Sequence, residues 1–554
     1  MGDEATVQKP GSFLCHLWRC GALGAALCCT LPAVARPQSS PANPPSVSVK
    51  APERFLFGIG SVVQLTAQVI DPDSPPVPDA AFVWKSSDPG IAVVDATGKV
   101  TATGFGVAAI TAVAANGAEG TCLLKVLPEL PGEIRASATV AYIGVNVAPM
   151  DREQVLEKQT VIVRQGRIAQ VGPADSIEIP EDAERIEAED WYLMPALADL
   201  HTHLVYGPHW ENDLLLFLAN GVTTVRDMWG MTPFLQWRRA IAGGAALGPR
   251  LYLASTGMDG PGGPFAALTP PVTSPFEVRW LVASYKALGY DYIKVYSYLT
   301  PDVYAAIIAE ARVQGMKVVG HTPYLVGLME VLASGQYSIE HFMGIGELAS
   351  SNGSMITGVL DESRLKELAE MVRAADVWTT ATLAISTVSL DQVPALQQRP
   401  EMRYVSPEMG AWFQHPSNAA PNRDLSRATA NRKMVLKTLH DAGAKLILGV
   451  DSGFRYVLPG YSIHDELRLA VEAGLTPFQA LRLSTVNAAV FLEKQEEMGV
   501  VGVGKRADLL LLQENPLQDV ANVGKRVGLM VDGRWFSEKR LKEKLADIAR
   551  SYAR

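Results

Sequence analysis

The chain has 554 residues, which at roughly 100–200 residues per domain indicates several domains. Hydrophobic residues make up 48% and charged residues only 19%, so the chain can bury a large core and is unlike disordered proteins. The net charge of −9, without blocks of Lys or Arg, argues against nucleic acid or an anionic membrane as a partner. After residue 35 no apolar run approaches the roughly 18–20 residues that a bilayer span requires, so we expect no membrane span.

The first 35 residues have the pattern of a signal peptide. An apolar stretch at 21–35 follows Arg19 and ends in Ala33-Val34-Ala35, a small-residue cleavage pattern. We therefore expect residues 1–35 to be removed and the protein to be exported, to the periplasm or outside the cell. The alternative is a disordered N-terminus or one created by a wrong start site. Four of the five cysteines lie in this segment, so the mature chain keeps only Cys122 and forms no internal disulfide.

A linker and a small β domain come next. Residues 36–46 are rich in Pro, Ser and Asn and read as a stiff linker. From 47 to 128, short alternating strands with turn signals predict a β-sandwich. The stretches 83–89, 93–95 and 98–101 resemble the bacterial immunoglobulin-like group 2 domain. That resemblance implies an exported or surface protein and indicates no chemistry; Trp84 is expected in the core.

From about residue 193 to 493, apolar strands alternate with amphipathic helices. Eight such repeats predict an α/β fold, a (β/α)8 TIM-like barrel whose active site lies at the carboxyl ends of the strands. An open doubly wound sheet is the alternative, weakened because no Gly-rich phosphate turn follows any strand. The flanking segments 133–192 and 494–538 are strand-like and are predicted to pair into one composite β domain. The eight predicted strands are 197–203, 221–228, 249–256, 291–297, 317–323, 337–343, 377–384 and 445–452.

Residues that can bind metal fall at the ends of these strands. His201 and His203 end the first strand, and residues two apart point to the same side of a strand. Four of the chain's nine histidines lie at the ends of predicted strands. Buried histidines that only make ordinary hydrogen bonds in a core would not be expected to gather there. Histidine and carboxylate ligands at an open site suit zinc, and also manganese, iron or cobalt. The other predicted ligands are Lys294 in the fourth strand, His321 after the fifth, His341 after the sixth and Asp451 after the eighth.

Lys294 needs a separate explanation, because an ammonium group has no lone pair and repels cations. A deprotonated lysine beside metal can react with CO2 to give an anionic carbamate that is long enough to bridge two metals. Charge balance favours this reading: two divalent cations bring four positive charges, which Asp451, a hydroxide and a carbamate largely offset, whereas an unmodified lysine would bury extra positive charge.

These residues together resemble the amidohydrolase superfamily. That family carries an HxH motif on strand 1, often a carboxylated lysine on strand 4, histidines on strands 5 and 6, and an aspartate on strand 8. Further resemblance lies in residues 195–199, 221–227, 338–341, 474–477 and 504–509, and it points to the imidazolonepropionase-like branch over roughly 135–540. It implies two divalent metal ions, zinc in the first place, with Lys294 carbamylated. It also implies a metal-activated hydroxide, with Asp451 as the acid and base that moves the proton.

Substrate contacts are expected from the loops at the same end of the barrel. Tyr296 shares the side of Lys294 and is a candidate donor to substrate; His209, after the HxH motif, and His464, after Asp451, are further candidate substrate-binding residues. In contrast, Arg226 and Asp227 are expected to form a structural pair. Glu340 is expected to point away from its neighbour His341 and to be structural.

We therefore expect an exported metal-dependent amidohydrolase that cleaves a C–N bond in a small molecule such as a dipeptide or N-acyl amino acid. One alternative is a lactonase or esterase with the same binuclear site, because a fold does not fix a substrate. Another is a binding protein in which the immunoglobulin-like domain acts and the barrel is inert. No feature of the sequence specifies the oligomeric state.

Overall fold

The computed structural model describes residues 46–70, 81–265, 269–419, 421 and 424–553. The predicted signal peptide, 1–35, and residues 36–45 of the predicted linker lie outside the described residues. The chain divides into two compact units, Met1–Glu129 and Leu130–Arg554. The composite β segments and the barrel therefore belong to a single unit.

The described part of the first unit is built of strands, as the alternating pattern predicts. Its strands pair as β1–β4, as β2–β9–β8–β5 and as β3–β7–β6. Apolar residues of alternate positions, among them Ile110 and Leu124, are fully buried between them, and Trp84 packs against this core. The strands are β1 (Ser46–Lys50), β2 (Phe55–Phe57), β3 (Val62–Gln64), β4 (Thr66–Ile70), β5 (Phe82–Ser86), β6 (Ala92–Val94), β7 (Lys99–Ala102), β8 (Gly106–Ala114) and β9 (Glu119–Leu127).

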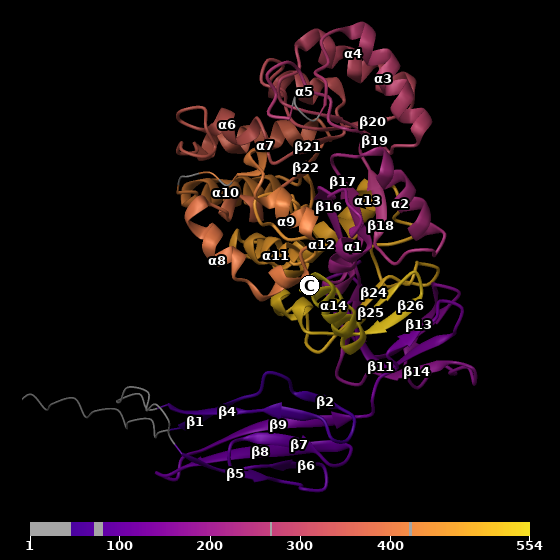
Figure 1. Ribbon diagram of the computed structural model, residues 1–554, viewed down its shortest axis with the longest axis vertical. Helices are drawn as coiled ribbons and strands as arrows, with labels where there is room; N and C mark the ends of the chain where they lie inside the picture. The colour runs from indigo at the N-terminus through magenta and orange to yellow at the C-terminus, as the bar shows by residue number, and fades with distance from the viewer. Residues whose placement is uncertain (1–45, 71–80, 266–268, 420, 422–423, 554) are drawn as a thin grey trace, which may run out of the picture. The chain divides into compact units, whose positions relative to one another are not determined.

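In the second unit, strands from both ends of the chain form one sheet. The path runs β10-β26-β25-β24-β15-β11-β12-β13, with β14 paired to β11. Figure 1 shows the yellow C-terminal strands beside the violet strands that precede the barrel. Two fully buried side chains, Tyr142 and Trp535, pack with ring centroids 5.8 Å apart and so join the two segments. The strands are β10 (Glu133–Ile134), β11 (Val140–Val147), β12 (Leu156–Arg164), β13 (Arg167–Pro173), β14 (Glu184–Glu187), β15 (Tyr192–Pro195), β24 (Leu509–Leu512), β25 (Arg526–Val531) and β26 (Arg534–Ser537).

Each of the eight segments predicted as barrel strands contains a parallel strand. The first three form the sheet β16-β17-β18 and the other five the sheet β19-β20-β21-β22-β23. Parallel bridges join the two sheets on both sides, between Thr202 and Ser452 and between Ala254 and Tyr292. This is the strand order of a TIM-like barrel. The strands are β16 (Leu197–Thr202), β17 (Val222–Asp227), β18 (Arg250–Leu253), β19 (Tyr292–Val295), β20 (Lys317–Gly320), β21 (Ser338–Glu340), β22 (Trp378–Thr380) and β23 (Lys445–Ile447).

Helices surround these strands, and their apolar faces form the main core. Several begin at the Ser, Thr or Asp caps expected of helix starts; Ser274 Oγ, for example, accepts a hydrogen bond from the Glu277 N–H. The barrel helices are α1 (Trp210–Ala219), α2 (Thr232–Ala242), α3 (Pro275–Leu288), α4 (Pro301–Val313), α5 (Leu328–Ser334), α6 (Ile345–Ala349), α7 (Glu362–Ala374), α10 (Ser426–Asp441), α11 (Ser462–Glu472), α12 (Pro477–Ser484) and α13 (Val486–Phe491).

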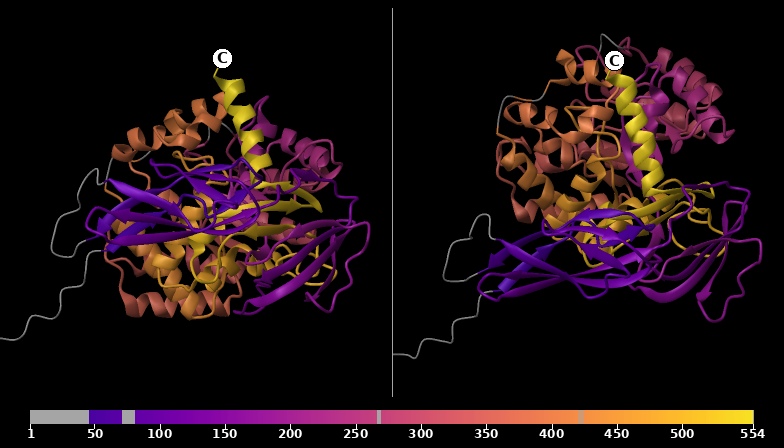
Figure 2. Two further views of the ribbon diagram at one scale, coloured as in Figure 1. Left: turned by 90° about the horizontal axis from the view of Figure 1, so that it is seen from below. Right: turned by 60° about the horizontal axis from the view of Figure 1, so that its bottom comes forward.

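Two further parts of the unit bear on the site. Between β22 and α10 lies a long insertion that carries α8 (Val393–Gln397) and α9 (Pro407–Phe413). The C-terminal helix α14 (Glu538–Tyr552), which ends at the label C in Figure 2, packs against α1 and β25. None of the helices in the described residues has both the length and the apolar character that crossing a membrane requires.

Candidate active site

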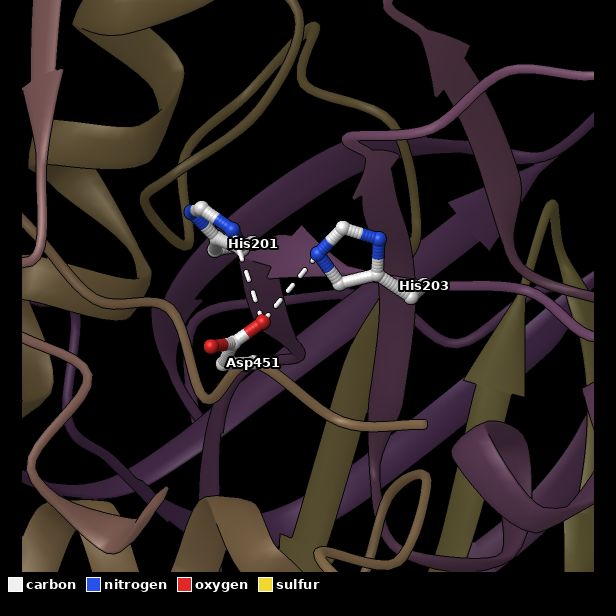
Figure 3. Close-up of side chains that lie close together, drawn as sticks. All are labelled: His201, His203 and Asp451. Atoms are coloured by element: carbon white, nitrogen blue, oxygen red, sulfur yellow. Dashed lines mark ion pairs between the residues drawn. The ribbon is translucent and has the colours of Figure 1, made fainter. Parts of the chain in front are cut away.

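Two histidines and an aspartate meet where the first and eighth strand segments end. Asp451 Oδ1 lies 3.1 Å from His203 Nε2 and 3.6 Å from His201 Nε2. Figure 3 shows both rings directed at this one carboxylate. All three side chains are buried, and one donor atom from each lies within 4.8 Å of the others. A set of two imidazoles and one carboxylate at such distances can hold a metal ion.

Backbone hydrogen bonds bring the two strand ends together. The Asp451 N–H donates to the His201 carbonyl at 2.7 Å, and the His203 N–H donates to the Ser452 carbonyl at 2.8 Å. Gly449 permits this approach, because a Cβ there would lie 2.5 Å from His201 Cβ. Asp451 itself has φ of 64°, in the left-handed region that non-glycine residues rarely adopt. Strained backbone of this kind concentrates at functional sites.

The histidines after the fifth and sixth strands complete a cluster of imidazoles. The His341 ring centroid is 4.5 Å from that of His201 and 5.1 Å from that of His321. His341 Nδ1 also lies 3.9 Å from Asp451 Oδ2. Lys294 lies in β19 and is fully buried. The structure thus gathers at one end of the barrel every residue that the sequence predicts as a metal ligand.

Several buried polar atoms of this cluster have no hydrogen-bond partner. They are His201 Nε2, His321 Nε2 and Lys294 Nζ. The Nδ1 atoms of His321 and His341 do have hydrogen-bond partners. Ser297 Oγ lies 2.7 Å from His321 Nδ1, and Thr382 Oγ1 lies 2.7 Å from His341 Nδ1. Buried polar groups without partners are rare and call for an explanation. A divalent metal ion fits the two imidazole nitrogens, because it would use the lone pairs that the protein itself leaves unsatisfied.

The charge state of the cluster also suits a cation. Burial lowers the pKa of His201 to about 4 and holds the pKa values of His321 and His341 well below the usual range, so these rings are neutral and carry free lone pairs. Burial also lowers the pKa of Lys294 to about 8, against the opposing effect of nearby carboxylates. Burial alone would raise the pKa of Asp451, but the surrounding histidines outweigh it and keep the pKa well below normal.

A buried carboxylate, Glu340, orients His201, which corrects two expectations from the sequence. Its Oε2 accepts a 2.7 Å hydrogen bond from His201 Nδ1, and Arg226 Nη2 donates to both of its oxygens at 3.0 Å. Glu340 and His341 therefore both contact His201 and do not point in opposite directions, because His341 has φ of 63° and the alternation of the strand ends there. Arg226 pairs with Glu340 rather than with Asp227, whose oxygens accept backbone N–H bonds. A carboxylate behind a metal-binding histidine fixes its tautomer and orientation.

A cavity of about 380 Å³ opens beside this cluster, and His203 is part of its wall. The sequence predicts substrate contacts from the loops at this end of the barrel, but it does not single out the other lining residues, because they carry no motif. His415 is exposed, lines the cavity and stacks on Trp412. The other lining residues are Leu204, Val205, Tyr206, Trp229, Met231, Phe265, Glu408, Ala411 and Phe454.

The three predicted substrate-binding residues have different surroundings. Tyr296 is buried, with its ring centroid 4.1 Å from that of His321 and 5.3 Å from Lys294 Nζ, so it lies at the cluster. His209 does not line the cavity, but its Nδ1 is 2.9 Å from Oε2 of Glu408, which does. His464 is on α11 with its Nε2 3.5 Å from Arg526 of β25, so the structure does not bring it to the cavity.

Strand order and site together define a class of protein: an enzyme with a TIM-like barrel and a buried site that can hold a metal ion at its carboxyl end. Comparison with known proteins then gives the family. Residues 192–536 match the amidohydrolase family, and the chain belongs to it. It is a hydrolase that acts on carbon–nitrogen bonds. Residues 78–116 match the intimin immunoglobulin-like domain, which confirms an immunoglobulin-like domain in the N-terminal unit.

Relatives in several organisms agree with this assignment. Ochratoxinase of Aspergillus niger is 23% identical over 458 residues, which cover 70% of this chain and 83% of that protein. Imidazolonepropionase of Geobacillus sp. is 23% identical over 419 residues, which cover 68% of this chain and 90% of that protein. A putative prolidase from Bifidobacterium longum has a similar fold, with a TM-score of 0.56 at 24% identity, over 75% of this chain and 99% of that one. These comparisons confirm the TIM-like barrel domain.

The contact between Glu340 and His201 leads to a prediction about metal affinity. Changing Glu340→Gln should weaken metal binding about 10- to 100-fold, because the ring loses the carboxylate that orients it. Competition with a chelator, followed by metal analysis, measures the change. Glu466→Gln is the matched control: Glu466 is also buried, but it accepts the backbone N–H groups of Leu383 and Ala384 and contacts no ligand. Equal affinity in the two variants would contradict the role of Glu340.

Proposed function

We propose that this protein is an exported, binuclear metal-dependent amidohydrolase that cleaves the C–N bond of a small amide, such as a dipeptide or an N-acyl amino acid. The observation that carries the proposal is the buried cluster of His201, His203 and Asp451, with unpartnered imidazole and amine nitrogens beside it. An inert barrel would have no reason to keep such atoms unsatisfied, since each one costs stability. Membership of the amidohydrolase family supports the same chemistry.

In the proposed site, His201, His203, His321, His341 and Asp451 hold two divalent ions, zinc in the first place, with a carbamylated Lys294. Metal ions in such a site lower the pKa of water and polarise the carbonyl group that is attacked. Burial of the site restricts bulk water, and Glu340 and Ser297 keep the His201 and His321 rings in place. In this scheme Tyr296, whose ring packs against His321, donates a hydrogen bond to the substrate.

Asp451 moves the proton in this scheme. Its carboxylate is ionised and buried beside His203 and His341. Asp451 Oδ1 or Oδ2 accepts a proton from the attacking water and passes it to the leaving nitrogen, which departs as a neutral amine. A lactonase or esterase would use the same residues, so hydrolysis of amides has to be compared directly with hydrolysis of esters and lactones.

The role of Asp451 is tested by Asp451→Asn. Turnover of a dipeptide or N-acyl amino acid should fall about 100- to 10,000-fold, because an amide side chain cannot carry the proton. The metal content of the variant is measured as well. Unchanged metal content assigns the loss of turnover to proton transfer, and lower metal content assigns it to the loss of a metal ligand. Asp361→Asn is the control, since Asp361 caps α7 away from the site and Asn is an equally good cap. Turnover near the original rate in Asp451→Asn would refute the acid–base role.

The carbamate is tested on Lys294. Wild-type chain 36–554, produced with zinc and bicarbonate, should contain near two metal ions per chain by elemental mass spectrometry. Lys294→Ala should lose metal and activity, and short carboxylic acids should restore part of both, because a free carboxylate can replace the carbamate. Lys317→Ala on the adjacent strand is the control, since its amine pairs with Glu493 instead. Unchanged metal content and rate in Lys294→Ala would exclude the carbamate. A wild-type chain free of metal after reconstitution would favour a binding protein.

Export is the remaining part of the proposal. The apolar segment 21–35 and its Ala33-Val34-Ala35 ending support removal by a signal peptidase. Protein recovered from outside the cytoplasm should therefore begin at Arg36 when its N-terminus is sequenced. Replacing Ala35 with Tyr should block this cleavage, because the peptidase accepts only small residues there. A chain that keeps Met1 and stays in the cytoplasm would contradict export.

A further inference from the structure

The cavity beside the metal cluster is walled by aromatic rings. His203 connects the two, because it lies 3.1 Å from Asp451 and its ring centroid is 4.6 Å from that of Phe454, another wall residue. A group that enters the cavity therefore ends next to the atoms that carry the chemistry. The volume, about 380 Å³, is within the range of pockets that enclose small molecules, roughly 300–1,000 Å³.

The rings of this wall come from three loops and one helix, and they contact one another. Trp229 follows β17, Phe265 follows β18, Trp412 is on α9 and Phe454 follows β23. Phe265 links them, with its ring centroid 5.2 Å from that of Trp229 and 5.9 Å from that of Phe454, and Trp412 lies 5.7 Å from Phe454. Edge-to-face and tilted contacts at these distances are the arrangement that aromatic groups prefer. A further ring could extend this cluster.

The charges of the wall favour a neutral occupant. Among the described residues that line the cavity, none is a lysine or an arginine. The one carboxylate, Glu408, already lies 2.9 Å from His209 Nδ1. A charged group placed here would lose its hydration without gaining an opposite charge, which is costly. A flat apolar group would instead bury its surface against the rings.

We propose that this cavity binds a large, uncharged aromatic group of the substrate, next to the bond that is cleaved. The enzyme would then select amides that carry an aryl or arylalkyl group and discriminate against small or charged ones. The inference rests on the proposed amide hydrolysis and adds the class of substrate. It also explains why the long insertion between β22 and α10 contributes α9: that helix supplies Trp412 to the wall.

The test compares kcat/KM for matched dipeptides in the metal-loaded enzyme: Ala-Ala, Phe-Ala, Ala-Phe, Glu-Ala, Ala-Glu, Lys-Ala and Ala-Lys. One of the two phenylalanine peptides should exceed Ala-Ala by about 10- to 100-fold, the effect of burying one aromatic side chain. The peptides with charged side chains should not exceed Ala-Ala. The position of the preferred phenylalanine tells which side of the bond enters the cavity.

Three variants connect the preference to the wall. Trp412→Ala should reduce the phenylalanine preference, which is the ratio of kcat/KM for the preferred phenylalanine peptide to kcat/KM for Ala-Ala, at least about tenfold. Trp412→Phe should keep most of the preference. Trp280→Ala is the matched control, because Trp280 is 71% exposed on α3 and does not line the cavity. If hydrolysis proceeds without an aromatic preference, or with a charged peptide preferred, the inference is wrong while the proposed hydrolysis stands.

A binding experiment separates the inference from catalysis. Calorimetry with the full metal-loaded chain compares 4-phenyl-2-butanone with 2-butanone, two neutral ketones that contain no bond to hydrolyse. The phenyl ketone should bind at least about tenfold tighter, and Trp412→Ala should abolish the difference. If no amide is cleaved but this difference is found, the proposed function fails and the aromatic site stands. Equal binding of the two ketones would overturn the inference.

Discussion

The active site depends on the hydrogen-bonded contact between the end of the first barrel strand and the segment after the eighth. The Asp451 N–H bonds to the His201 carbonyl and the His203 N–H to the Ser452 carbonyl, so residues 250 positions apart are held at bonding distance. Gly449 is part of the same constraint, because any side chain there would collide with His201. Without this contact the two histidines and the aspartate would not share a centre. The left-handed backbone at Asp451 is one consequence.

A buried ionic network supports the cluster from the other side. Arg226 is fully buried, donates to Glu340, and lies with its guanidinium carbon 4.6 Å from the centre of the Phe491 ring. Glu340 is ionised, because Arg226 and the His201 N–H offset the cost of its burial, and its pKa stays well below the usual range. Breaking such a buried pair leaves an uncompensated charge and typically costs about 3–5 kcal/mol. The network therefore links the stability of the barrel to the orientation of the His201 ring, a predicted metal ligand.

The proposed chemistry and the proposed selectivity come from different parts of the barrel. The predicted metal-binding side chains lie on or next to β-strands, whose positions are fixed by neighbouring strands, whereas the clustered aromatic rings of the cavity come from three loops and from the insertion that carries α9. Separation of this kind lets one hydrolytic centre serve different substrates, since loops tolerate change that strands do not. Relatives that share the family at 23% identity carry names as different as ochratoxinase and imidazolonepropionase.

The sequence by itself determined the eight strands and the predicted metal-binding residues, because hydrophobic periodicity and the HxH spacing are local signals that survive folding. The same patterns predicted the TIM-like barrel and the small β-sandwich, and a resemblance to known sequences identified that sandwich as immunoglobulin-like. Only the tertiary structure decided the contacts of Glu340, since the turn at His341 ends the alternation that predicted it to point away. The same holds for His464, which the fold directs to Arg526, and for the aromatic wall. Loops meet through the packing of the whole barrel, and no short-range pattern in the chain encodes which of their side chains will share a cavity.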